Sequence, residues 1–255
     1  MSDDLTFVHD PLAVRLGRLP ARADDRTLRL ATYMAGTLPP SRPAVDYLSK
    51  VSSFPLYDNS VIGDCTCAAA AHLIESWTAY AGSIILPADA AVLQAYEQVG
   101  GYVPGQPNTD HGAVMLDVLR RWASTGLMGR KITAYVAVNH LNRQEVELAL
   151  EWFGGLYVGV ALPRSAQFQA IWQVVPDPMG TPGSWGGHAI QVGRYDQTYL
   201  YCTTWGAIKQ MTWDWWNRYV EECWAILSPD WLSDEKSPEG LDIAALQGDL
   251  QKVRA

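Results

Sequence analysis

A cysteine at the start of a predicted helix and a histidine at the start of a predicted strand are the residues best suited to chemistry. Cys65 follows the turn Asn59–Asp64 and begins an alanine-rich run that predicts a helix over 65–81. The free N–H groups and partial positive charge of a helix N-terminus favour a thiolate, which is the nucleophilic form of cysteine. His188 opens an apolar run after the glycine-rich segment Gly183–Gly187. Together they could form a Cys–His pair that attacks an amide carbonyl.

Cys67 is a competing nucleophile, because it lies two residues further along the same predicted helix. An α-helix turns by about 100° per residue, so Cys67 points well away from Cys65. Both thiols therefore cannot face His188.

Metal binding is the other chemistry that these side chains could perform, with Cys65, Cys67 and His72 as ligands. Structural zinc sites space paired cysteines by about two to four residues and need a second pair of ligands. Cys202 and Cys223 supply that second pair poorly. We therefore expect neither a metal ion nor another cofactor.

The order and spacing of short motifs over roughly 180 residues carry a family resemblance. The region from about Ala44 to Leu227 resembles the papain-like cysteine peptidases, in which the cysteine and histidine are roughly 130 or more residues apart. Here they are 123 positions apart. The matching motifs, in chain order, are Val45-Asp46-Tyr47, Pro55, Ile74-Glu75, His188-Ala189, Val192-Gly193 and Thr204-Trp205-Gly206.

This resemblance implies a role for each of several residues. Counting from Asp46, Pro55 and Ile74-Glu75 makes Cys65 the nucleophile each time, with His188 as general base and acid. The family's oxyanion-hole glutamine corresponds to Asn59, and its histidine-orienting asparagine to Thr203. The residues that it implies for substrate binding are Asp110, Gly112, Gly187 and Trp205.

Two departures from the family pattern leave the activity open. Asn59 carries the same NH₂ donor as glutamine but reaches one methylene less far, and a Thr203 hydroxyl orients an imidazole less firmly than an amide. The expected function is hydrolysis of peptide or protein amide bonds through a thioester on Cys65. The alternatives are a papain-fold acyltransferase or amidase with another acyl acceptor, or an inactive binding or structural module. Asp110 could equally be a simple helix cap.

The order of predicted helices and strands along the chain indicates an α+β fold with a helical half and a strand-rich half. The resemblance implies a cleft between the two halves. Helices are predicted over 65–81, 112–124 and 143–153, and strands over 156–162, 189–194, 199–202 and 223–227. We divide the chain into an N-terminal arm and linker (1–42), a papain-like domain (43–231) and an acidic tail (232–255). Short helices are predicted at 25–35 in the arm and at 242–253 in the tail.

Composition excludes several classes of partner. Nineteen Lys and Arg against 27 Asp and Glu give a net charge of −8 without a dense basic patch, so we expect no nucleic-acid partner. Apolar stretches of about ten residues are too short to span a bilayer. The acidic start Met1–Asp4 lacks the apolar core of a signal peptide, and the four cysteines fit free thiols. We therefore expect a cytoplasmic protein of bacterial or phage type; the oligomeric state cannot be derived from the sequence.

Overall fold

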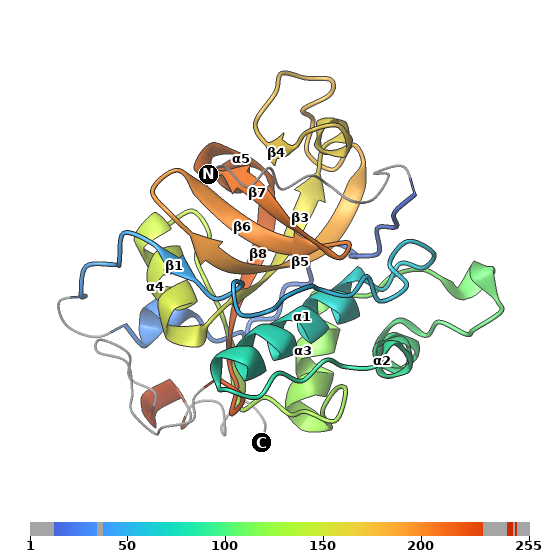
Figure 1. Ribbon diagram of the computed structural model, residues 1–255, viewed down its shortest axis with the longest axis horizontal. Coiled ribbons are helices and arrows are strands. Elements are labelled where there is room, and N and C mark those ends of the chain that lie inside the picture. The colour runs from blue at the N-terminus through green and yellow to red at the C-terminus, as the bar shows by residue number, and fades with distance from the viewer. Residues whose placement is uncertain (1–12, 35–37, 232–243, 247, 249–255) are drawn as a thin grey trace.

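The computed structural model describes residues 13–34, 38–231, 244–246 and 248, and it has an α+β fold. Helices pack against one twisted sheet, with α1 lying directly beneath it in the view of Figure 1. The helices are α1 (Cys65–Tyr80), α2 (Asp89–Gly100), α3 (Met115–Ser124), α4 (Arg143–Phe153) and α5 (Trp213–Tyr219). The strands are β1 (Val45–Asp46), β2 (Ala134–Ala137), β3 (Leu156–Leu162), β4 (Ile171–Trp172), β5 (Gly186–Tyr195), β6 (Tyr199–Thr204), β7 (Ala207–Thr212) and β8 (Val220–Leu227).

Helix α1 is the central helix of the molecule. It packs on β5 and is flanked by α2 and α3 (Figure 1). Its four consecutive alanines, Ala68–Ala71, are all buried, because their small side chains let the helix approach the sheet closely. The helix therefore holds Cys65, its first residue, against the sheet.

The sheet runs in the order β2-β8-β3-β5-β6-β7-β4, with β1 paired to β5. Strands β3, β5, β6 and β8 pair antiparallel with their neighbours in this order. His188 lies near the start of β5, opposite Val160 of β3. Every residue of β3 is buried, since helices and the arm cover the sheet on both sides.

The predicted central elements are confirmed, α4 and β3 with the predicted bounds and the others with shifted ends. The helix predicted over 65–81 is α1, that over 143–153 is α4, and the four predicted strands are β3, β5, β6 and β8. The helix predicted from Gly112 begins only at Met115, because Gly112 has a left-handed backbone (φ 79°) and both backbone groups of Ala113 are hydrogen-bonded to Gly17 and Leu19 of the arm. The sequence did not predict α2, α5, β2 or β7.

The arm is extended where a helix was predicted. Over 25–35 only a short 3-10 helix forms, at Leu30–Thr32, so the prediction was wrong; the buried Leu30 and Tyr33 anchor this segment in the core instead. Residues 244–246 and 248 of the predicted tail helix are helical, and the remainder of that prediction lies outside the described residues. In the described part of the chain, no helix is both long and apolar enough to cross a membrane.

Candidate active site

The Cys65 thiol is buried at the N-terminus of α1, beside strand β5. The backbone N–H of Ala189, the residue after His188, lies within hydrogen-bonding reach of the sulfur. Burial raises the pKa of Cys65 to about 12, although the N–H groups of Ala189 and Gly17 and the charge of Arg18 oppose this rise. In this closed state the residue is therefore a neutral thiol.

His188 is held by two residues from the end of β6. Its Nε2 lies 2.7 Å from the hydroxyl oxygen of Thr204, and its ring stacks on Trp205 at a centroid distance of 4.3 Å. Nδ1 is buried and has no hydrogen-bond partner among the residues that the structure describes. With Thr204 accepting from Nε2–H, the lone pair on Nδ1 is left to take a proton. Burial lowers the pKa of His188 to about 3, with the charge of Arg18 adding to the effect.

Thr203 was expected to orient His188, but the structure places it on the other face of the sheet. Thr203 pairs with Gln191, and the amide of Gln191 donates to Ser76 of α1, so Thr203 lies on the helix side of the sheet. Within the described part of the chain, its hydroxyl has no hydrogen-bond partner. Successive side chains of a strand point to opposite faces, so the next residue, Thr204, shares the face of His188. The histidine is therefore positioned by Thr204.

Asn59 lies close to the N-terminus of α1, where an oxyanion donor is needed. Its side-chain amide donates to the carbonyl oxygen of Ile62 at 3.1 Å, and the side chain is buried. Its backbone carbonyl accepts from the N–H of Arg15 in the arm. Its part in an oxyanion hole stays a prediction, because the amide is engaged within its own turn.

Asp110 fastens the cysteine turn to the segment before α3. Both oxygens of its carboxylate lie 3.1 Å from the N–H of Gly63, and it also accepts from the hydroxyl of Tyr96. The oxygen of Tyr96 in turn accepts from the N–H of Gly112 at 2.8 Å. Asp110 is thus a positioning residue for both walls of the site. It is not a helix cap, since the residue before α3 is Val114.

Residues 14–19 of the N-terminal arm, which we call the cleft segment, lie across this site. The backbone of the segment is hydrogen-bonded to every wall: Arg15 N to Asn59 O, Ala113 N to Gly17 O, Leu19 N to Ala113 O and Arg18 N to Gly187 O, at 2.8–3.2 Å. The indole N–H of Trp205 donates to the carbonyl of Arg15 at 3.1 Å. Gly112, Gly187 and Trp205, predicted to bind substrate, thus all contact the chain's own arm.

Glycines allow the cleft segment to lie so close. A Cβ on Gly17 would overlap the carbonyl oxygen of Gly63 and lie 2.6 Å from its Cα. A Cβ on Gly112 would overlap the carbonyl of Gly17 in the same way. The turn before Cys65 is therefore covered by backbone, with no room for substrate while the segment is in place.

The side chain of Arg18 fills a buried acidic pocket beside the site. Its guanidinium pairs with Glu222 of β8 at 3.0 Å and also with Glu221; the side chains of Arg18 and Glu222 are only 2% and 8% exposed. The indole N–H of Trp224 donates to the second oxygen of Glu222 at 2.9 Å. The carboxylate of Glu222 is therefore held in place by the indole of Trp224 at one oxygen and neutralised by Arg18 at the other.

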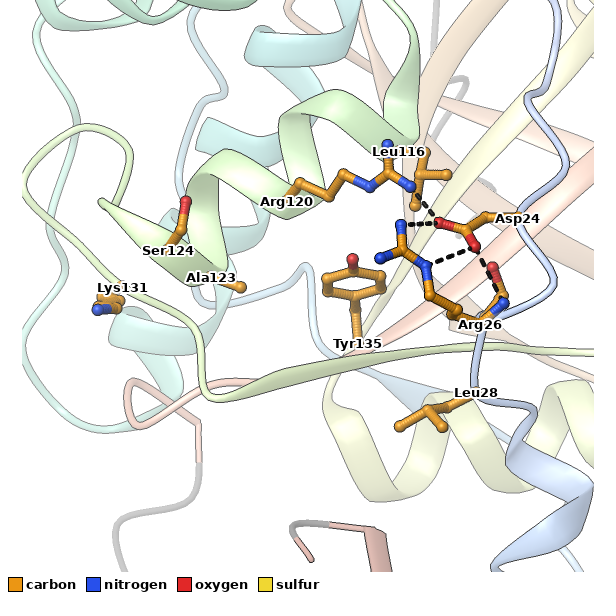
Figure 2. Close-up of a pocket in the computed structure, with 10 residues that line it drawn as sticks. Asp24, Arg26, Leu28, Leu116, Arg120, Ala123, Ser124, Lys131 and Tyr135 are labelled. Atoms are coloured by element: carbon orange, nitrogen blue, oxygen red, sulfur yellow. Dashed lines mark hydrogen bonds and ion pairs between the residues drawn. The ribbon is translucent and has the colours of Figure 1, made fainter. Parts of the chain in front are cut away.

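A second attachment of the arm lies further along the chain. Figure 2 shows Asp24 pointing toward Arg26 and toward Arg120 of α3, and both contacts are ion pairs. They border a cavity of about 660 Å³ whose wall includes Tyr135 (Figure 2). None of the predicted site residues lines this cavity. It belongs to the attachment of the arm, not to the chemistry.

Several solved structures of cysteine proteases are similar to this chain. The chain is similar to xylellain, a cysteine protease from Xylella fastidiosa (TM-score 0.65, 17% identity, 85% of this chain and 97% of that one). It is also similar to digestive procathepsin L 3 of Tenebrio molitor (0.58, 12%, 85% and 77%) and to the bromelain protease of Ananas comosus (0.53, 17%, 73% and 99%). The chain has the papain-like fold. No protein-family sequence model matches it, and neither does any curated protein sequence.

On this papain-like fold, sequence reasoning missed the residues that close the site. Gly17, Arg18 and Glu222 carried no local signal, because the contacts that give them a role are with residues far along the chain, such as the Arg18–Glu222 pair. The sequence indicated Thr204 only as part of the motif Thr204-Trp205-Gly206. Among the described residues, no three His, Cys, Asp or Glu side chains group so as to hold a metal ion.

Proposed function

We propose that the protein is a cysteine peptidase that its own cleft segment keeps inactive. The observation that carries the proposal is the state of His188, whose Nε2 is held by Thr204 and whose ring is held by Trp205, while Nδ1 has no hydrogen-bond partner among the described residues. A base that is oriented by one nitrogen and free at the other is what a thiol nucleophile needs.

In the proposed reaction, the proton of Cys65 passes to Nδ1 of His188 as the sulfur attacks the carbonyl carbon of a peptide bond. The tetrahedral oxyanion is stabilised by the N–H of Cys65, which has no acceptor inside its helix, and by the amide of Asn59 once this turns from Ile62. His188 then gives its proton to the leaving amine, and a thioester remains. Water, activated by the same histidine, releases the acid and restores the thiol.

In the closed site, the protonation states of Cys65 and His188 do not favour this reaction. With the cleft segment in place, burial keeps Cys65 protonated and His188 neutral at pH 7, since their pKa values are about 12 and 3. Displacement of the segment admits water and removes much of this burial, so both pKa values move toward neutrality. Activity therefore requires the cleft segment to leave.

Turnover of a fluorogenic peptide mixture by a full-length Gly17→Ala variant tests the proposal. In that background Cys65→Ala abolishes turnover, whereas Cys67→Ala, which removes the neighbouring thiol, retains most of it. Equal loss in both variants, or full turnover in Cys65→Ala, would show that Cys65 is not the nucleophile. A cytoplasmic location and the nature of the acyl acceptor stay predictions.

A further inference from the structure

The pocket that holds Arg18 has the form of a binding site for one kind of side chain. Glu222, Gly159 and Ala189 lie side by side across β8, β3 and β5, on the face that packs against α1. Ala189 is the residue whose N–H reaches the sulfur of Cys65. Strand β3 therefore lies between Glu222 of the pocket and Ala189, the residue beside the nucleophile.

Gly159 gives the pocket its depth. A Cβ at this position would lie 2.6 Å from Cγ of Glu222, 2.8 Å from Cδ of Arg18 and 2.9 Å from Sδ of Met115. Any side chain larger than hydrogen would therefore close the channel along which the aliphatic part of Arg18 runs. The remaining space suits a long, narrow side chain with a charged end.

The floor of the pocket is a carboxylate that needs a cation. Trp224 holds one oxygen of Glu222, and the other faces the guanidinium. When the cleft segment leaves, Glu222 loses its ion-pair partner while Trp224 still holds its other oxygen, and a cation that enters the pocket restores the pair. Glu221 stands at the mouth, 48% exposed, and binds a second nitrogen of the same guanidinium.

We propose that this pocket selects arginine in the substrate, and that Arg18 occupies it as a stand-in for that residue. The inference rests on the proposed peptidase function and names its substrate class: peptides with arginine close to the bond that is cleaved. Two carboxylates against two guanidinium nitrogens suit the planar fork of arginine better than the single ammonium of lysine.

The test measures binding and turnover separately. Binding uses full-length protein with Gly17→Ala and Cys65→Ala, titrated calorimetrically with a peptide of the sequence of residues 14–19 and with the same peptide carrying citrulline in place of Arg18. Citrulline keeps the shape and loses the charge. We expect about 100-fold weaker binding of the citrulline peptide, since a buried polar group left unpaired discriminates strongly. Glu222→Gln reduces the ratio to below about threefold, and Glu221→Gln, at the exposed mouth, changes it by less than Glu222→Gln does.

Equal binding of the two peptides would overturn the inference. Turnover by Gly17→Ala of matched fluorogenic substrates with arginine or citrulline separates the two proposals. Turnover at equal rates removes the selectivity and leaves the peptidase, whereas arginine-dependent binding without any turnover removes the peptidase and leaves the pocket. If Gly17→Ala does not fold, full-length Arg18→Ala replaces it. Acetyl-arginine amide then raises its melting temperature and acetyl-citrulline amide does not, and equal effects of the two would again contradict the pocket.

Discussion

Alanine at position 17 is expected to force the cleft segment out of the active site. The backbone at Gly17 does not need the left-handed region, so the added methyl group acts through contact alone. That methyl overlaps the carbonyl oxygen of Gly63 and lies 2.6 Å from its Cα, and backbone on both sides cannot give way as a flexible side chain would. The segment must therefore lift from the turn before Cys65.

The size of the effect follows from the contacts that are lost. Four backbone hydrogen bonds tie the segment to the walls of the site. At a net contribution of about 0.5 kcal/mol each, the low end of the usual range, they hold it with about 2 kcal/mol. Since 1.4 kcal/mol is a factor of ten, the exposed state becomes at least about 30-fold more populated. Loss of the Arg18–Glu222 pair adds to this.

Alkylation of Cys65 by iodoacetamide at pH 7.5, followed by peptide mass spectrometry, measures that population. We expect at least about 30-fold faster labelling in Gly17→Ala than in the wild type, with Cys67, Cys202 and Cys223 unchanged. Gly248→Ala is the matched control, because a Cβ at this position meets no described residue within 4 Å. A Gly17→Ala protein that is folded, as judged by its melting temperature, and labels at the wild-type rate would refute the role of the cleft segment.

Other substitutions test the base and the buried titratable groups. In the Gly17→Ala background, Thr204→Val should lower kcat at least tenfold, whereas Thr203→Val, on the other face of β6, should leave kcat nearly unchanged. Values of kcat are measured over a series of pH values. A larger loss of kcat in Thr203→Val than in Thr204→Val would restore Thr203 as the orienting residue. Burial raises the pKa of Glu75 to about 8, so its contribution to stability is present below about pH 4.5 and is lost as pH rises through 8. Glu75→Gln should therefore raise the melting temperature relative to wild type by several degrees more at pH 8.5 than at pH 5, and a difference independent of pH would contradict this. Burial lowers the pKa of His72 to about 4 and that of His188 to about 3, so stability falls as pH drops below about 6.5, where the unfolded chain takes up protons. His72→Gln, which keeps a donor for the carbonyl of Pro55, should make thermal unfolding less sensitive to acid between pH 6.5 and 4, and an unchanged slope would show that His72 is not responsible.

The fold and the places of Cys65 and His188 on their elements could be predicted because their signals are local. The alanine run of α1 and the apolar strands β3 and β5 have clear patterns, and motif order placed Cys65 and His188 at the ends of the right elements. The orienting residue could not be chosen this way. Thr203 and Thr204 are adjacent, and only the pairing register of β5 with β6 decides which of them faces the histidine.

The closed state was out of reach of the sequence for a different reason. Nothing in the residues around Gly17 indicates that this glycine lies against Gly63, because the need for glycine comes from a backbone far along the chain. The same holds for Arg18, because the sequence does not distinguish it from the other arginines of the arm. Only its contact with Glu222 in the folded chain does so. Close approach and burial of charge are properties of the assembled chain.

The most direct test of the central claim is to trap the acyl-enzyme. The full-length Gly17→Ala protein is mixed with an arginine-containing peptide ester, quenched in acid during turnover and analysed by peptide mass spectrometry. We predict a single acyl adduct, bound as a thioester to Cys65, that is absent when His188 is also replaced by alanine. Turnover without an adduct on Cys65, or an adduct that forms equally fast without His188, would contradict the proposed Cys65–His188 mechanism.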